Sequence, residues 1–467
     1  MRKATKLSIG FFLLLFVGGG FAADKLVVHE WGTFTSLQDE TGKSIGGINT
    51  DEEPVPNFVH ELGNLLLIKP TDLAPIWMKG APRCHPDVTM RLETPVIYFH
   101  LPPGQKELQT NAKVTFRGGW LTQYYPNAEA DVPKLQSGGF NFGRITSATV
   151  GSLTWKGLRI TGTFEPQASA APAETRPATA QLLQPPVTKV RSWLAPRDVR
   201  AALVVTPANE AERFLFYRGV GFLDAPLRIT RSKNGETLKI SSQLDPALKM
   251  GTQLKIAHLW QVDARDDGSM AFRALKSVTV DTKDGPSIPA KFDEKDFLTD
   301  NRVKLRNRIY EALLEEGLFA DEAYALLNTW EQAYFKSTGQ RIFFLVPREW
   351  TDHYLPLELA APADVSRVMI GRIEMVAPRH RALLAKIAAG PASNGEMPRR
   401  VGERYREFSE GEASGESRQI FPADYRAFLE LGRFRNALLL EEQRRHPTPA
   451  LNDFIKNYGL QAYAPRD

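Results

Sequence analysis

Short segments rich in β-branched and aromatic residues run through the first 290 residues, and they constrain the fold more than any other feature of the chain. In the clearest, 94–100, a proline occupies the second position, where the start or edge of a strand tolerates it. Regular short strands between turn residues predict one or two β-sandwich-like domains. By the same criteria we expect strands at 26–29, 65–69, 112–116, 153–161, 201–205, 213–218, 227–230, 238–242 and 253–262.

The hydrophobic periodicity changes near residue 301. Apolar residues recur at helical spacing over 303–314 and again over 323–335, and Gly317 and Gly339 end the two runs. This pattern predicts a helical hairpin. Further strands are expected at 341–346 and 368–374, and helices at 379–390 and 423–445. The predicted fold is therefore mainly β, with a C-terminal mixed α+β region that contains the hairpin.

Changes in composition suggest the domain boundaries. Residues 165–186 are rich in Ala, Pro, Thr and Gln, which is typical of a linker or insert, and the polar stretch 391–418 indicates a loose loop. The predicted organisation is a signal peptide (1–23), an N-terminal β-rich domain (24–164), the linker or insert (165–186), a second β-rich region (187–290) and the α+β region (291–467).

The N-terminus has the three parts of a secretory signal. Arg2, Lys3 and Lys6 precede an apolar run over 7–17, and small residues follow up to Ala23. The run is short for a membrane span, which needs about 20 apolar residues, although an uncleaved anchor remains the alternative. We therefore expect an exported protein, periplasmic or extracellular, without a transmembrane span in the mature chain.

Charge and cysteine content argue against a nucleic-acid-binding protein and against a disulfide-stabilised one. The net charge of +5 includes the three positive charges of the leader, so the mature chain carries +2, and no dense basic cluster occurs. A nucleic-acid partner is not expected. Cys84 is the single cysteine, so no intrachain disulfide can form, and a lone thiol in an oxidising compartment is most often buried.

No familiar catalytic motif is complete in this sequence. His60-Glu61 begins like a zinc-protease helix, but Asn64 occupies the position of the second histidine. No nucleophile elbow, phosphate loop or dinucleotide fingerprint is present.

Histidines are unevenly distributed. Four of the eight lie between residues 24 and 100, and several of these adjoin acidic residues or Cys84. Imidazoles and a carboxylate are ligands that Zn²⁺ prefers, whereas Cys84 or Met90 nearby would favour copper. The alternative is ordinary histidines satisfied by backbone carbonyls. The candidate metal ligands are His29, His60, His85, His100 and Glu53, with Glu30 or Glu93 as the catalytic base.

Two other groups have a functional and a structural interpretation. Arg348, Asp352 and His353 could bind an anionic substrate, although a surface ion pair is the commoner outcome. An aromatic face for a glycan or peptide competes with core packing, the more frequent fate of large aromatic side chains. Its members would be Trp31, Trp120, Tyr124 and Tyr125.

Several long phrases resemble an uncharacterised family of exported bacterial proteins. They are His-Glu-Trp-Gly-Thr-Phe-Thr-Ser at 29–36, Glu-Thr-Pro-Val-Ile-Tyr-Phe at 93–99, and segments at 214–219, 317–323 and 367–374. The resemblance implies one architectural unit over 24–467, with inserts. It implies no activity, substrate or cofactor.

Two functions follow as hypotheses. The first is a metal-dependent, hydrolase-like extracytoplasmic enzyme in which a metal-activated water is the nucleophile. The second is a non-catalytic cell-envelope protein that binds a glycan or another protein. Convergence of at least three early histidines within about 5 Å of one point would favour the first, because metal–nitrogen bonds are near 2 Å.

Overall fold

The computed structural model describes residues 25–50, 55–56, 58–62, 77–78, 80–131, 133, 142–163, 191–245, 248, 253–390 and 423–465. The predicted leader, the strand at 65–69, the segment 165–186, the loop 391–418 and Glu53 lie outside these residues.

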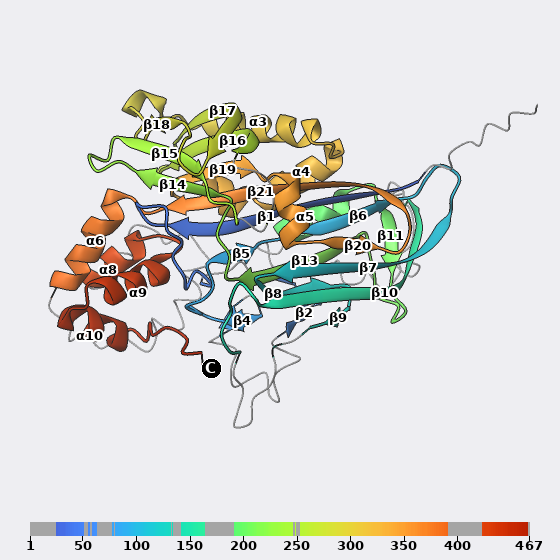
Figure 1. Ribbon diagram of the computed structural model, residues 1–467, viewed down its shortest axis with the longest axis horizontal. Helices are drawn as coiled ribbons and strands as arrows, with labels where there is room; N and C mark the ends of the chain where they lie inside the picture. Colours follow the sequence, from blue (N-terminus) through green and yellow to red (C-terminus); the bar gives the residue numbers. More distant parts are fainter. Residues whose placement is uncertain are drawn as a thin grey trace, which may run out of the picture.

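A 16-stranded mixed sheet dominates the structure, with β1 (Leu26–Gln38) near its centre (Figure 1). On one side β1 pairs in parallel with β21 (Ala363–Met375) over their full length. On the other it pairs antiparallel with β5 (Met90–Leu92) and β6 (Val96–His100). The first and the last strand along the described chain thus lie side by side, and the sheet draws on all three regions that were predicted to contain strands.

The remaining strands extend this centre in both directions. Beyond β5 and β6 come β13 (Phe214–Gly221), β8 (Gly119–Tyr125), β10 (Val150–Thr163), β7 (Glu107–Arg117), β11 (Ala202–Val205) and β12 (Ala211–Glu212). Beyond β21 come β19 (Gly339–Leu345), β16 (Gln253–Ala264) and β17 (Met270–Asp281). Short strands β2 (His60–Glu61), β9 (Glu129–Ala130) and β20 (Leu357–Leu359) pair with β8, β10 and β7. Two small sheets consist of β14 (Leu227–Arg231), β15 (Thr237–Ser242) and β18 (Ser287–Pro289), and of β3 (Trp77–Met78) with β4 (Ala81–Pro82).

Strand β1 is buried on both faces, which explains why its sequence does not alternate between polar and apolar residues. Val28 and Phe34 belong to one core cluster, and Trp31 belongs to a second one on the opposite face. The second cluster is completed by α3 (Asn301–Glu315) and α4 (Ala320–Thr329), the predicted helical hairpin. The hairpin therefore packs on the face of β1 that carries Trp31.

Other helices lie after the hairpin. A π-helix, η7 (Glu331–Lys336), leads into β19, and α5 (Arg348–Tyr354) precedes β20. Four further helices gather at one end of the molecule, where they form a third core cluster (Figure 1). They are α6 (Pro378–Ala389), α8 (Ala423–Glu430), α9 (Arg435–Arg445) and α10 (Pro449–Asn457). The expected class, mainly β with a C-terminal mixed α+β region, is confirmed.

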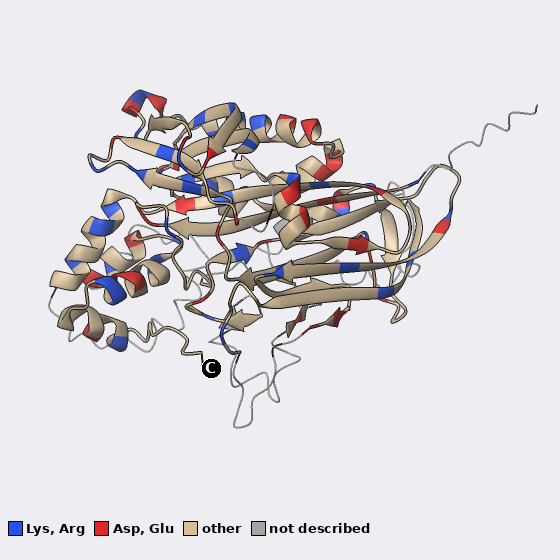
Figure 2. Ribbon diagram, in the orientation of Figure 1, with Lys and Arg blue, Asp and Glu red and all other residues tan. Residues whose placement is uncertain are grey.

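Basic and acidic residues are interspersed along the strands and helices rather than segregated by sign (Figure 2). None of the helices within the described ranges is long and apolar enough to cross a membrane. Cys84 is buried, as expected for a lone thiol. Trp31, Tyr124 and Tyr125 are also buried, so core packing accounts for most of the proposed aromatic face.

Candidate metal centre

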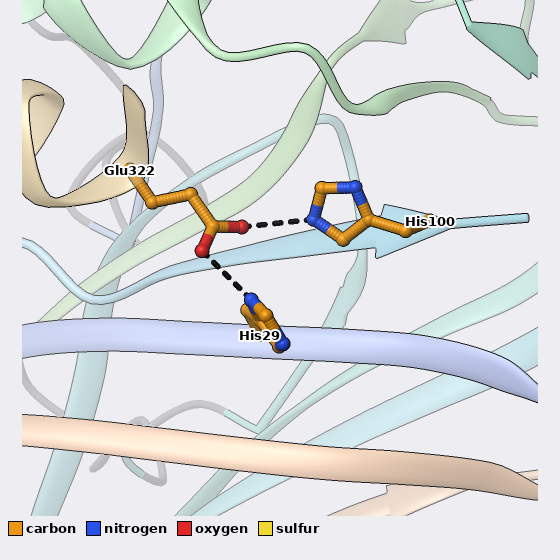
Figure 3. A group of neighbouring side chains, drawn as sticks. All are labelled: His29, His100 and Glu322. Atoms are coloured by element: carbon orange, nitrogen blue, oxygen red, sulfur yellow. Dashed lines mark hydrogen bonds and ion pairs between the residues drawn. The ribbon is translucent and has the colours of Figure 1, made fainter. Parts of the chain in front are cut away.

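Three side chains from distant parts of the sequence meet at one edge of the hairpin (Figure 3). The Nδ1 atom of His29 lies 2.7 Å from Oε2 of Glu322, and Nε2 of His100 lies 2.8 Å from Oε1 of the same carboxylate. One ligand atom from each residue lies within 4.8 Å of the other two. Glu322 thus bridges the two imidazoles.

The strand ladder brings the two histidines together. In the β1–β6 pair, His29 is opposite Tyr98 and Val27 is opposite His100. Side chains two residues apart on a strand share a face, so His29 and His100 are diagonal neighbours on the same face. Their ring centroids are 5.3 Å apart. The register alone therefore positions two nitrogen ligands.

The third residue of α4 supplies the carboxylate. Gly317 has a φ of 94°, which allows the chain to turn sharply between α3 and α4. The backbone N–H of Phe319 donates to Oε2 of Glu322 at 2.8 Å, so the carboxylate also satisfies an N–H at the start of the helix. Three hydrogen bonds fix the position of Glu322.

The cluster is largely shielded from solvent. The side chains of Glu322, His29 and His100 are 0%, 5% and 14% exposed. Burial acts to raise the pKa of Glu322, but hydrogen bonds from His100 and His29 outweigh it, so the pKa of this carboxyl is lowered from its usual value. The ring of Phe319 packs against both imidazoles, with centroids 4.5 and 4.8 Å away, and is itself 46% exposed. Phe319 thus lies between the cluster and solvent.

The donor set suits a divalent ion. Two imidazole nitrogens and one carboxylate are the ligands of a class of catalytic zinc sites that keep a fourth position open. Zinc bonds near 2.0–2.1 Å in a tetrahedral arrangement separate ligand atoms by about 3.3 Å. The two nitrogen–oxygen distances here are 2.7 and 2.8 Å. An ion would therefore require Glu322 to move away from both rings, and the three ligand atoms, which lie within 4.8 Å of one another, to turn toward a common point.

The other two predicted histidine ligands lie elsewhere. His60 pairs with Glu210 at 2.8 Å and its ring stacks on Tyr124. His85 bonds through Nε2 to the carbonyl oxygen of Gly143 at 2.8 Å, and burial lowers its pKa. Within the described ranges, the structure brings together two of the four predicted histidines, so the convergence of three early histidines that would favour the enzyme is not met, and the third ligand comes from Glu322 instead.

Glu30 lies on the opposite face of β1 from His29, because adjacent strand residues alternate. Its carboxylate accepts a hydrogen bond of 2.6 Å from the Tyr217 hydroxyl and forms a buried ion pair with Arg367. Arg367 in turn reaches Asp352 at 2.9 Å. The structure thus places Glu30 in an ion-pair network and does not bring it to the histidines.

Glu93 lies farther along the same strand pairing. Its backbone N–H bonds to the carbonyl oxygen of Thr33, which is four residues, or roughly 13 Å, along β1 from His29. Its buried carboxylate lies 3.4 Å from Nε of Arg91 and 3.7 Å from Nη2 of Arg433. The structure does not bring Glu93 to the cluster either.

The segment that could bind an anion is helix α5, and its charged residues form ion pairs. Arg348 and Asp352 are 2.7 Å apart on successive turns of α5, and both side chains are partly exposed. His353 lies 3.4 Å from Arg117. The ion-pair interpretation accounts for Arg348 and Asp352.

Glu322 was the member of the cluster that sequence reasoning missed. It lies within the 317–323 segment that carries the family resemblance, just before the apolar run predicted as the second helix of the hairpin, and it is the third residue of α4. Glutamate is common there because it caps the helix start, so its position alone gave no indication of a ligand.

In comparisons with known proteins, no family model matches the chain and no curated protein matches it.

Proposed function

We propose that this protein is an extracytoplasmic metal-dependent enzyme of the hydrolase type, in which His29, His100 and Glu322 hold one Zn²⁺ ion. The observation that carries the proposal is the meeting of three ligand atoms, contributed by β1, β6 and α4, within 4.8 Å of one another. Export is part of the proposal and is supported by the signal-like composition of residues 1–23.

The residues have distinct roles in this proposal. His29 and His100 present their nitrogens from a rigid part of the sheet, since β1 is paired on both sides. Glu322 supplies the negative charge, and its lowered pKa keeps it ionised. A bound Zn²⁺ would polarise a substrate carbonyl and lower the pKa of a water molecule toward ~7. Substrate would approach from the side of Phe319 and His100, where the cluster reaches solvent.

A second candidate, a non-catalytic binding protein of the cell envelope, is favoured by a different observation. The hydrogen bonds of 2.7 and 2.8 Å satisfy Glu322 without an ion, and they tie the hairpin to the sheet. In that case the hairpin would serve as the binding element for a glycan or protein. Its exposed large hydrophobic residues are Val303, Leu314, Phe319 and Tyr324.

Metal analysis separates the two candidates. The purified mature protein is dialysed against Zn²⁺, its metal content is measured by mass spectrometry, and its activity is assayed on chromogenic esters, peptides and phosphoesters. His258→Ala is the matched control, because His258 also pairs with a glutamate, Glu315, at 2.8 Å but has no second histidine on that carboxylate. We expect one Zn²⁺ per chain and metal-dependent hydrolysis, both lost in His29→Ala and kept in His258→Ala. Absence of bound metal in the wild type would favour the binding protein.

A further inference from the structure

The surroundings of the metal centre restrict the chemistry of the bond that it could hydrolyse. Within the described ranges, no lysine or arginine hydrogen-bonds or ion-pairs with His29, His100 or Glu322. Enzymes that cleave phosphoesters place further metal ions, or Lys and Arg side chains, on the transferring phosphoryl group. The described residues contain a single three-ligand cluster, and one divalent ion beside one carboxylate suits an uncharged carbonyl group better.

Phe319 provides an apolar contact directly beside this centre. Its ring lies 4.5 and 4.8 Å from the two imidazole centroids, and 46% of the residue is exposed. A ligand that covers the remaining apolar surface of a half-exposed phenylalanine removes it from water, which favours binding. Because the ring touches both imidazoles, a group that covers it would also lie beside the ion.

Other exposed hydrophobic residues accompany it. Among the described residues, seven large hydrophobic side chains are exposed, and four of them lie on the hairpin: Val303, Leu314, Phe319 and Tyr324. The hairpin therefore carries more than half of the exposed large hydrophobic residues in the described ranges.

We infer that the substrate is a neutral ester or amide with an apolar acyl or aryl group, and that Phe319 is the residue that selects this group. The inference rests on the proposed metal centre. Hydrolysis breaks the single bond between the carbonyl carbon and the ester oxygen or amide nitrogen. Water supplies OH to the carbonyl carbon and H to the leaving group, so the products are a carboxylic acid and an alcohol or amine. The apolar group packs on the Phe319 ring while the carbonyl carbon faces the centre.

Hydroxamates test this inference without requiring turnover, because they chelate zinc through two oxygens and carry a variable chain. Binding of acetohydroxamate, hexanohydroxamate and benzohydroxamate to the zinc-loaded full chain is measured by calorimetry. We expect hexanohydroxamate and benzohydroxamate to bind at least about tenfold more tightly than acetohydroxamate, from apolar area buried on the ring. Phe319→Ala should reduce this ratio to near one, and Phe319→Leu should retain part of it.

Phe222→Ala is the matched control, since Phe222 is similarly exposed, at 43%, but lies far from His100. The start of β13 pairs with β6, the strand that carries His100, whereas Phe222 follows the other end of β13. This variant should leave the ratio unchanged. Two results would overturn this inference but leave the proposed metal centre standing. In the first, the protein binds zinc without preferring the larger hydroxamates; in the second, Phe319→Ala leaves that preference intact. Failure to bind zinc would instead overturn the proposed function itself.

Discussion

Glu322, in the first turn of α4, accepts a hydrogen bond of 2.7 Å from His29 of β1, which lies 293 residues earlier in the chain. The same carboxylate lies 2.8 Å from His100 and accepts the N–H of Phe319. One buried side chain therefore joins the helical hairpin to the centre of the sheet. This arrangement gives the carboxylate a structural role whether or not it also binds an ion.

Replacement of Glu322 by alanine is expected to destabilise the fold. It would leave the buried His29 ring, the half-buried His100 ring and one backbone N–H without their partner. We expect a loss of about 3 kcal/mol in the free energy of unfolding, measured by urea denaturation. Glu315→Ala is the control, because Glu315 pairs with His258 near the surface and should leave stability close to that of the wild type. Equal stability of the two variants would show that the Glu322 bonds contribute nothing.

Glu30 is expected to matter for stability rather than for metal binding. Glu30→Ala would leave the buried Arg367 guanidinium without its main counter-charge, which typically costs about 3–5 kcal/mol. Arg348→Ala, which removes only the exposed arm of the same network, should have little effect. Urea denaturation and zinc binding are measured on both variants. If the Glu30→Ala protein were stable but no longer bound zinc, Glu30 would be part of the metal site, contrary to this account.

The fold should lose stability in mild acid because of His380. Burial lowers the pKa of this histidine to about 4, and its Nδ1 accepts the N–H of Ala377. The unfolded chain, with a pKa near 6.5, binds the proton first as the pH falls. The free energy of unfolding should therefore decrease by about 3 kcal/mol between pH 6.5 and pH 4 on account of this group.

The corresponding test follows unfolding as a function of pH. His380→Gln should flatten the decrease, whereas His446→Gln should leave it unchanged, since His446 is exposed. His85, whose pKa is also lowered by burial, accounts for part of the remaining slope. An unaltered slope in His380→Gln would contradict this assignment.

Elements with one buried face were predictable from sequence. The hairpin was expected from its apolar periodicity, and the structure has it at Asn301–Glu315 and Ala320–Thr329. The strand expected at 112–116 lies inside β7, whose exposed and buried residues alternate. In both cases a solvated face produces the pattern that the prediction detects.

Elements buried on both faces were predicted only in part. We expected a strand at 26–29, but β1 continues to Gln38, because its neighbours cover both faces and remove the alternation. The pairing of β1 with β21 links residues more than 300 positions apart, and no local pattern indicates it. His29 and His100 could be proposed from the uneven distribution of histidines. Glu322 could not, because it meets them only through contacts between distant parts of the chain.

The central claim is that His29, His100 and Glu322 hold a metal ion, and anomalous X-ray scattering tests it most directly. Crystals of the protein without residues 1–23, grown with Zn²⁺, are measured on both sides of the zinc absorption edge. The proposed centre predicts one strong anomalous peak about 2 Å from His29 Nδ1, His100 Nε2 and a Glu322 oxygen. Well-ordered side chains with no peak between them, still joined by the direct 2.7 and 2.8 Å hydrogen bonds, would contradict it.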